Sequence, residues 1–368
     1  MSPKKILIFS LSYFPLIGGA EVAIKEITDR ISDFEFDMIT MRFDKSHPKF
    51  ERVGNVNVYR VGGGLGYFSK ILFVPQAVLF SLRRKYDTYW VMMTYMLFPI
   101  TLGRILGDRT PYALTLQDGD PFTYVFGRLR ILLFKPLLYY GFRRVNKVQT
   151  ISNFLAEWAM KMGYKKEVQV IPNGVDLTKF PISNFQFPKN QDKITLITTS
   201  RLVEKNAVGD IIDALKFLPE SVSLKILGTG HLEKVLKLKV KSLKLENRVE
   251  FLGFVFPQEI PVYLHNSDIF VRPSLSEGMG ISFIEAMAAG VPIIATQVGG
   301  IKDFLIDGET GLVCNVHDPE SITKAVSRLV KDHTLRENIV KNAKKMVEER
   351  YDWNLIANEM KTRVFDKV

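Results

Sequence analysis

The residues from Pro273 to Gly300, PSLSEGMGISFIEAMAAGVPIIATQVGG, predict a loop, a helix and a buried strand in that order. Small and flexible residues fill Ser274 to Gly280, directly after an apolar strand that ends at Arg272. The apolar residues then recur with helical spacing until Gly290 and a nearby proline end the helix. One helix face is expected to meet a core and its neighbour to line the loop: Ile281, Ile284 and Ala288 on the first, and Ser282, Glu285 and Ala289 on the second.

A helix that begins in such a loop predicts a binding site for a phosphorylated ligand. Its first backbone N–H groups have no partner within the helix and carry a partial positive charge. The glycines at 278 and 280 let a ligand approach the backbone, and Glu277 and Glu285 are spaced to grip different parts of it. The alternative is that Glu277 complements the helix dipole and Glu285 is a solvated surface charge.

The spacing Glu277-x7-Glu285 within this stretch resembles the signature of the retaining GT-B glycosyltransferases of family four, including enzymes similar to phosphatidylinositol mannosyltransferases. The resemblance covers nearly the whole chain. It implies that Glu277 lies by the donor sugar and that Glu285 binds the ribose hydroxyls. It also implies that the intervening backbone amides hold the donor diphosphate, which assigns that role to Gly278, Met279, Gly280, Ile281 and Ser282.

Short apolar runs alternate with amphipathic stretches along the chain, which predicts an α/β protein with two Rossmann-like, doubly wound domains. A helix is expected over 127–142. The resemblance adds a GT-B cleft between an acceptor domain, 1–181, and a nucleotide-sugar domain, 194–351, with 352–368 packing back on the first domain. The segment PISNFQFPKNQDK, 181–193, has two prolines and no periodicity, so it is the expected linker.

Two cations are candidates for stabilising a departing diphosphate. Arg201 follows the first strand of the second domain and Lys205 lies four residues later. The resemblance supports both roles, although the lysine of the family usually stands one position later and precedes a glycine. This chain has Asn206 and Ala207 at those two positions.

Three further loops are candidate donor contacts. Gly19 lies at the first strand-to-helix turn, and the resemblance assigns it to the leaving diphosphate or to the acceptor side. Gly228, in the sequence GTG, resembles a family loop near the nucleotide. Val255 stands where the family places the base. Each of the three is also compatible with a plain turn.

Gln117 stands where many members of the family have a histidine that contacts the donor sugar. A glutamine can donate a hydrogen bond but cannot take a proton, so a role that needs imidazole is in doubt. Asp118-x-Asp120 matches a manganese-binding pattern that chance alone explains. The five histidines show no ligand spacing, so no metal and no cofactor are expected.

Length and composition agree with two globular domains. The chain has 368 residues and one cysteine, Cys314, which excludes an internal disulfide and fits a reducing compartment. The first strand, from Lys5, is preferred to a signal peptide. The longest uncharged stretch contains Pro99 and is too short for a membrane span. A cytoplasmic protein at the inner face of the cell membrane is expected.

The net charge of +11 resides almost wholly in the first half, where residues 1–180 carry 25 Lys and Arg against 15 Asp and Glu. No acidic residue lies between Asp120 and Glu157, and 126–147 interleaves cations with apolar side chains. This pattern predicts contact with an anionic membrane, with 68–86 as a second candidate and nucleic acid excluded. The cations are Arg128, Arg130, Lys135, Arg143, Arg144 and Lys147. The alternative is an ordinary helix with one solvated basic edge.

The resemblance thus implies a retaining, metal-independent glycosyltransferase that moves a hexose from a UDP- or GDP-sugar to a membrane lipid or lipid-linked glycan. Two alternatives stay open. One is a nucleotide-sugar-binding protein without turnover, which Gln117 suggests. The other is a nucleotide-sugar epimerase of similar two-domain fold. A nicotinamide oxidoreductase is disfavoured because no G-x-G-x-x-G follows the first strand.

Overall fold

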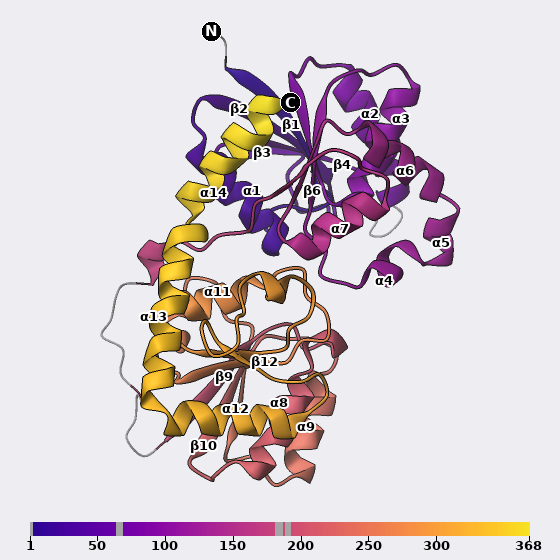
Figure 1. Ribbon diagram of the computed structural model, residues 1–368. Helices are drawn as coiled ribbons and strands as arrows, with labels where there is room; N and C mark the ends of the chain where they lie inside the picture. The colour runs from indigo at the N-terminus through magenta and orange to yellow at the C-terminus, as the bar shows by residue number, and fades with distance from the viewer. Residues whose placement is uncertain (1–2, 64–68, 181–186, 188–192) are drawn as a thin grey trace. The chain divides into compact units, whose positions relative to one another are not determined.

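The computed structural model describes residues 3–63, 69–180, 187 and 193–368 (Figure 1). The chain divides into two compact units, Met1–Asn173 with Trp353–Val368, and Gly174–Asp352. The first unit ends earlier than the predicted boundary at 181, because Phe180 is buried and lines a cavity of the second unit with Leu177 and Ala288. Most of the predicted linker, 181–193, lies outside the described residues.

The first unit is built on a mostly parallel eight-stranded sheet in the order β3-β4-β2-β1-β5-β6-β7-β8. Its strands are β1 (Lys4–Phe9), β2 (Phe34–Met41), β3 (Phe50–Val53), β4 (Val56–Val61), β5 (Thr88–Met92), β6 (Tyr112–Leu116), β7 (Lys147–Thr150) and β8 (Val168–Val170). The central strands β5 and β6 are buried along their whole length, as expected for a sheet covered on both faces. The edge strand β3 pairs antiparallel with β4 and is a feature that the sequence analysis missed.

Helices connect the strands of the first sheet (Figure 1). They are α1 (Gly19–Arg30), α2 (Ser69–Leu82), α3 (Leu97–Ile105), α4 (Phe122–Phe126), α5 (Leu129–Leu132), α6 (Lys135–Arg144), α7 (Asn153–Lys161) and, from the end of the chain, α14 (Trp353–Glu359). A π-helical turn, Met360–Val364, continues α14.

The single helix predicted over 127–142 was wrong, because the segment forms the short helices α5 and α6 after α4. Gly127 ends α4 by donating its N–H to the carbonyl of Thr123 at 2.8 Å. Arg128 then adopts an extended backbone, and Pro136 in the first turn of α6 supports a fresh helix start. The predicted single helix is therefore replaced by short helices with breaks between them.

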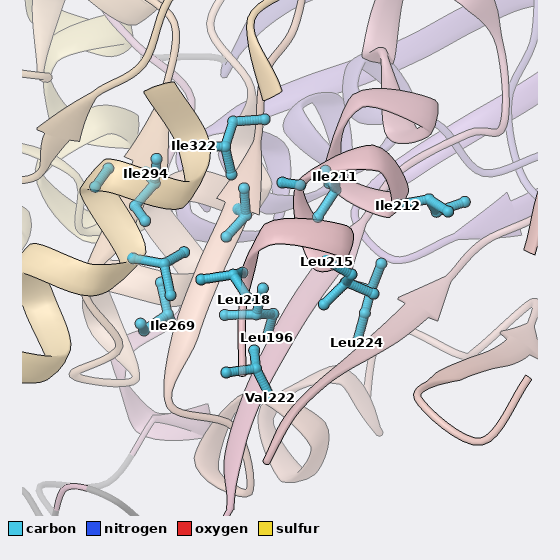
Figure 2. Close-up of a cluster of buried hydrophobic side chains, with 14 of the residues drawn as sticks. Leu196, Ile211, Ile212, Leu215, Leu218, Val222, Leu224, Ile269, Ile294 and Ile322 are labelled. Carbon is cyan, nitrogen blue, oxygen red and sulfur yellow. The ribbon is translucent and has the colours of Figure 1, made fainter. Parts of the chain in front are cut away.

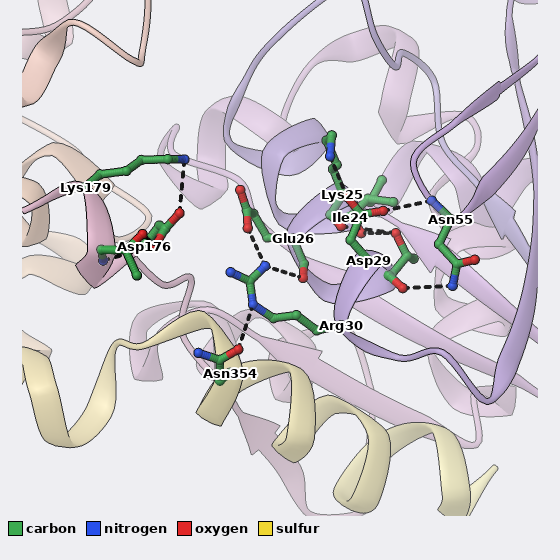
Figure 3. A network of polar contacts seen from close by, with 11 residues as sticks. Ile24, Lys25, Glu26, Asp29, Arg30, Asn55, Asp176, Lys179 and Asn354 are labelled. Carbon is green, nitrogen blue, oxygen red and sulfur yellow. Dashed lines mark hydrogen bonds and ion pairs between the residues drawn. The ribbon is translucent and has the colours of Figure 1, made fainter.

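The C-terminal segment is part of the core of the first unit. Side chains of α14 and the following turns pack with β1, β2 and α1, and they include Trp353, Ile356, Met360 and Phe365. Polar contacts hold the same surfaces together: Arg30 Nε of α1 donates to Asn354 Oδ1 at 3.1 Å (Figure 3). The first unit is therefore completed by residues from the far end of the sequence.

The second unit holds a parallel six-stranded sheet in the order β11-β10-β9-β12-β13-β14. Its strands are β9 (Ile194–Thr199), β10 (Val222–Leu227), β11 (Val249–Gly253), β12 (Ile269–Arg272), β13 (Ile293–Ala295) and β14 (Leu312–Val313). Its helices are α8 (Val208–Ala214), α9 (Glu233–Ser242), α10 (Ile260–His265), α11 (Ile281–Ala288), α12 (Pro319–Lys331) and α13 (His333–Arg350). Leu196, Leu224 and Ile269 of the sheet pack with Ile211 and Leu215 beside α8 (Figure 2).

Candidate donor site of the second unit

The predicted site residues of the second unit gather where its strand order reverses. Strand β9 pairs with β10 on one side and with β12 on the other. In a parallel sheet this switch point lies where loops at the carboxyl ends diverge and leave room for a ligand. The loops after β9 and β12 are joined there, because Leu275 N–H donates to the carbonyl of Lys205 at 2.7 Å.

A buried arginine organises the loop after β12. Arg272 is the last residue of β12 and is 7% exposed. Its guanidinium donates to Ser274 Oγ at 3.1 Å, to Ser282 Oγ at 2.6 Å and to the carboxylate of Glu277. Burial lowers its pKa to about 10, with Arg201 nearby adding to the effect, so Arg272 stays charged at neutral pH. From the sequence, Arg272 was expected only to end an apolar strand.

Hydrogen bonds to its carboxylate and to its backbone carbonyl fix Glu277 in place. One carboxylate oxygen accepts from Arg272, and the other accepts the N–H of Gly278 at 3.1 Å. Its carbonyl accepts from Gly300 N–H at 2.9 Å. A Cβ on Gly299 would lie 2.0 Å from that carbonyl oxygen, so this close approach requires glycine. Because each carboxylate oxygen can accept more than one hydrogen bond, Glu277 can still accept from a ligand hydroxyl.

The helix α11 begins at Ile281 after Gly280, whose φ of 84° favours glycine. No side chain caps its first turn. The helix was predicted to have one apolar face, but it is buried nearly all round, and Phe283 is fully buried against Phe270 and Phe304. Its start therefore presents backbone groups on a rigid, packed element.

Glu285 lies one turn further along α11 and is partly buried. Burial raises the pKa of its carboxyl to about 7, and the positive charges of Lys179 and Arg272 oppose this rise. Lys179 also pairs with Asp176 at 3.3 Å (Figure 3). A carboxyl whose pKa lies near 7, close to charged side chains, is typical of a functional site.

The loop after β9 carries the two predicted cations. Arg201 is exposed and Lys205 is partly buried. Asn206 Nδ2 donates to the carbonyl of Arg201 at 2.6 Å, which closes this loop. Ala207 has a φ of 48°, in the left-handed region that favours glycine. The conformation explains why a glycine suits this position in the family pattern.

The glycine loop after β10 packs directly on the loop of Arg201. Gly228 has a φ of 130°, and a Cβ there would lie 1.9 Å from the carbonyl oxygen of Ser200. Leu202 N–H donates to the carbonyl of Thr229 at 2.9 Å. The glycine at 228 is therefore needed for chain packing, whatever its role toward a ligand. Sequence reasoning did not identify this reason.

Val255 lies after β11 between two exposed aromatic side chains. Phe254 is 62% exposed and Phe256 is 60% exposed. Their rings meet edge to face, with centroids 5.2 Å apart. Exposed rings of this kind offer a flat apolar surface.

Two predicted residues belong to the first unit. Gln117 follows β6, and its side-chain amide exchanges two hydrogen bonds with Asn173, at 3.3 and 3.2 Å. Asn173 is 7% exposed and was not predicted. Gly19 is exposed at the start of α1, and no atom would lie within 4 Å of a Cβ there, so no contact requires glycine. Both positions follow carboxyl ends of parallel strands, β6 and β1.

The described residues carry neither a cluster of metal ligands nor a membrane-spanning helix. They contain no group of three or more His, Cys, Asp or Glu side chains placed to hold a metal ion. None of the helices within the described ranges combines the length and apolar character needed to cross a bilayer.

Two family models match consecutive parts of the sequence. The model of Glycosyltransferase Family 4 matches residues 17–179, and that of Glycosyl transferases group 1 matches residues 179–346. The chain belongs to family four of the glycosyltransferases. It is a glycosyltransferase with two Rossmann-like units of the GT-B fold, as the sequence predicted.

Relatives of this glycosyltransferase match along nearly its whole length. An uncharacterized glycosyltransferase of Methanocaldococcus jannaschii is 28% identical, with 96% of each chain covered. Alpha-monoglucosyldiacylglycerol synthase of Acholeplasma laidlawii is 24% identical over 92% of this chain and 91% of its own.

Solved structures share the fold. Sucrose-phosphate synthase from Thermosynechococcus elongatus has a TM-score of 0.83 at 20% identity, with 99% of this chain and 98% of the other covered. HepE of Anabaena, in complex with UDP and glucose, has a TM-score of 0.79 at 22% identity, with 99% and 100% covered.

Proposed function

We propose that this glycosyltransferase moves a hexose from a UDP- or GDP-sugar to a membrane lipid or a lipid-linked glycan, with retention of anomeric configuration and without a metal. The observation that carries the proposal is the joined pair of loops after β9 and β12. They bring Arg201, Glu277 and the start of α11 to one switch point of the sheet. The structure of HepE with UDP and glucose supports a nucleotide-sugar donor.

The donor diphosphate would bind at the start of α11. Backbone amides within 278–282 and the positive end of the helix suit an anion there. Arg201 and Lys205, on the adjoining loop, would stabilise the negative charge that develops as the sugar–phosphate bond breaks. Because these groups would stabilise the diphosphate charge, the reaction would require no metal ion.

The two glutamates would bind the rest of the donor. Glu277, held by Arg272, would accept hydrogen bonds from sugar hydroxyls beside the oxocarbenium-like centre. Glu285 would bind the ribose hydroxyls. The aromatic pair around Val255 would meet the base, and Gly228 would let the nucleotide approach the backbone. Gln117 and Gly19 would contact the donor sugar and the leaving diphosphate or acceptor from the first unit.

Retention would follow from attack on the face that the leaving phosphate vacates. The acceptor hydroxyl oxygen forms the new bond to the anomeric carbon while the bond from that carbon to the phosphate oxygen breaks. The departing phosphate oxygen takes the acceptor proton, so no protein nucleophile is needed. A glutamine at 117 is compatible with this step because the step requires no imidazole.

The acceptor would come from an anionic membrane at which the protein docks, on the cytoplasmic side. Around α5 the described surface is apolar, with Leu129 81% and Leu133 78% exposed beside Arg128. Helix α2 adds exposed Leu72 and Leu79 as the second contact. Phe126, Leu138 and Phe142 lie within the predicted surface, 126–147, but they are buried in the first unit. The relative from Acholeplasma laidlawii, a synthase of a glycosyl diacylglycerol, supports a lipid acceptor.

Donor hydrolysis and transfer, measured with and without membrane lipid, test this proposal. A transferase should release nucleotide diphosphate faster when anionic lipid is present and should label the lipid. A binding protein would bind the donor without releasing nucleotide diphosphate. An epimerase would change the sugar without labelling lipid, and either result would overturn the proposal.

A further inference from the structure

The first unit contains a polar pocket at the opposite end of its sheet from Gln117. It lies by the amino-terminal ends of β6 and β7, whereas Gln117 and Gly19 follow carboxyl ends. A cavity of about 520 Å³ is lined by Arg104, Arg109, Pro111, Tyr140, Arg144 and Asn146. None of these residues belongs to the proposed transfer site.

Well-packed elements hold the pocket in shape. Helices α3 and α6 lie against each other (Figure 1), with Gly141 of α6 close to Leu97 of α3. The hydroxyl of Tyr112, at the start of β6, donates to the carbonyl of Gly141 at 2.5 Å. Asn146 Oδ1 accepts the N–H of Tyr112 at 3.1 Å. The wall of the pocket is therefore fixed by β6 and α6 together.

One arginine of the pocket is fixed by the backbone. Arg104 donates to the carbonyls of Asp108 at 3.0 Å and Thr110 at 2.5 Å. Its guanidinium carbon lies 5.3 Å from the ring centroid of Tyr112. These bonds are to neutral carbonyls, so the charge of Arg104 is not neutralised by them.

The other two arginines are available to a ligand. Within the described part of the chain, neither Arg109 nor Arg144 forms an ion pair or a side-chain hydrogen bond. Arg144 lies over the ring of Tyr140 at 5.6 Å. The acidic residue of this loop, Asp108, is occupied by the Tyr89 hydroxyl at 2.8 Å and by the N–H of Thr110 at 2.9 Å. The pocket thus carries an excess of positive charge.

We propose that this pocket binds a phosphoryl group. Planar guanidinium groups match the paired oxygens of a phosphate, and a dianion would balance the charge that several arginines concentrate here. The Tyr140 hydroxyl and the Asn146 side-chain amide supply further donors. The size of the cavity suits one such group and its immediate substituent rather than an extended phosphate backbone.

The phosphoryl group has two possible sources, a phospholipid headgroup and free phosphate. Ile105 and Leu106, next to Arg104 at the end of α3, are 65% and 59% exposed and would meet acyl chains if the source is a lipid. Neither source depends on the proposed transfer reaction. Arg144 is one of the cations predicted to meet a membrane, but Arg128, Arg143 and the exposed leucines of α5 do not line this pocket.

The test compares the full-length protein with an Arg109→Ala/Arg144→Ala variant and with Arg143→Ala as the control. Arg143 is exposed on the same helix as Arg144 but does not line the cavity. Orthophosphate is titrated against chloride at equal ionic strength, with Tm and calorimetric binding as readouts. Cosedimentation uses phosphatidylcholine vesicles with and without phosphatidic acid. Circular dichroism confirms that each variant is folded.

Phosphate should raise the Tm of the wild type and of Arg143→Ala, and the double variant should bind it at least about tenfold more weakly. Loss of vesicle binding in the same variant, with competition by orthophosphate, assigns the site to a lipid headgroup. Loss of phosphate binding alone assigns it to a free ligand. Equal phosphate binding by all three proteins, or none by the wild type, overturns the proposal.

Discussion

The guanidinium of Arg272 binds the carboxylate of Glu277 at the end of β12, and its other nitrogens reach Ser274 and Ser282. Both members of the pair are largely buried. The pair links the end of β12 to the loop before α11, so this loop is fixed before any ligand binds. This fixed geometry is what the proposed donor site needs, because preorganised groups cost little reorganisation during reaction.

Removing Arg272 should leave an uncompensated carboxylate in the loop. Arg272→Ala is expected to lower the free energy of unfolding by about 3–5 kcal/mol, measured by chemical denaturation. The double variant Arg272→Met/Glu277→Gln removes both charges and should be more stable than Arg272→Ala, while still lacking transfer activity. If the free energy of unfolding lost in the double variant equals the sum of the losses in Arg272→Met and Glu277→Gln, the pair is not coupled.

The loop of Gly228 should not accept a Cβ. Gly228→Ala is expected to lower the free energy of unfolding by at least about 2 kcal/mol, because the new atom meets the Ser200 carbonyl at a φ that disfavours alanine. Gly19→Ala is the matched control for stability, since no atom lies near its Cβ position, and it should change stability by less than about 1 kcal/mol. Equal losses in both variants would contradict this packing argument.

Glu285 should make stability depend on pH. Its folded-state pKa is raised to about 7, so between about pH 4.5 and 7 the native state binds more protons than the unfolded state. Stability from this group is therefore highest at low pH and is lost as pH rises through that window, by about 1–3 kcal/mol. Denaturation at several pH values should show this slope in the wild type and not in Glu285→Gln. Parallel pH profiles would refute the assignment.

The same titration should affect donor binding. A ribose hydroxyl donates to the carboxylate form, so the affinity for a nucleotide sugar should increase as pH rises through about 7. Calorimetry of the donor across this range checks the slope, and Glu285→Gln should bind more weakly than the wild type above about pH 7, with a flatter profile. An affinity that falls with rising pH would count against ribose contact by Glu285.

The amide pair of Gln117 and Asn173 should behave as a coupled unit. Asn173→Ala leaves Gln117 without its partner and should reduce both stability and transfer, by about 1–3 kcal/mol each. Gln117→Ala should cost a similar amount, and the double variant should cost less than the sum of the two. If the effects of Asn173→Ala and Gln117→Ala on kcat/KM were additive in the double variant, Asn173 would not position Gln117.

Periodicity was enough to predict most strands of both sheets, because their buried apolar runs lie between turn residues. It failed for β3, whose side chains alternate between exposed and partly buried. It also failed at 127–142, where the amphipathic pattern begins at Gly127, which ends α4, and continues across Pro136, which lies in the first turn of α6. Local pattern does not reveal where a continuous amphipathic stretch is interrupted.

Residues of the candidate site could be predicted where a short sequence pattern indicates them. They could not be predicted where their place depends on contacts with residues further along the chain. Glu277 and Glu285 stand in a recognisable spacing, and Arg201 follows a predicted strand. Arg272 was missed, because a charge at the end of an apolar strand usually reaches solvent. Here Ser274 and Glu277 of the following loop and Ser282 of α11 accept its hydrogen bonds, and the guanidinium is buried. Asn173 was missed for a similar reason, since its partner lies 56 residues away. No local signal in the sequence predicts these pairings.

The most direct test of the account is transfer of labelled hexose from UDP- and GDP-sugars to phospholipid vesicles in the presence of EDTA, followed by NMR of the anomeric proton in the product. The account predicts a labelled lipid with the configuration of the donor, formed without added metal. It also predicts that Arg201→Ala and Glu285→Gln lower kcat/KM by about 2–4 kcal/mol of transition-state stabilisation while remaining folded. An inverted product, activity restored only by manganese, or wild-type transfer in both variants would contradict it.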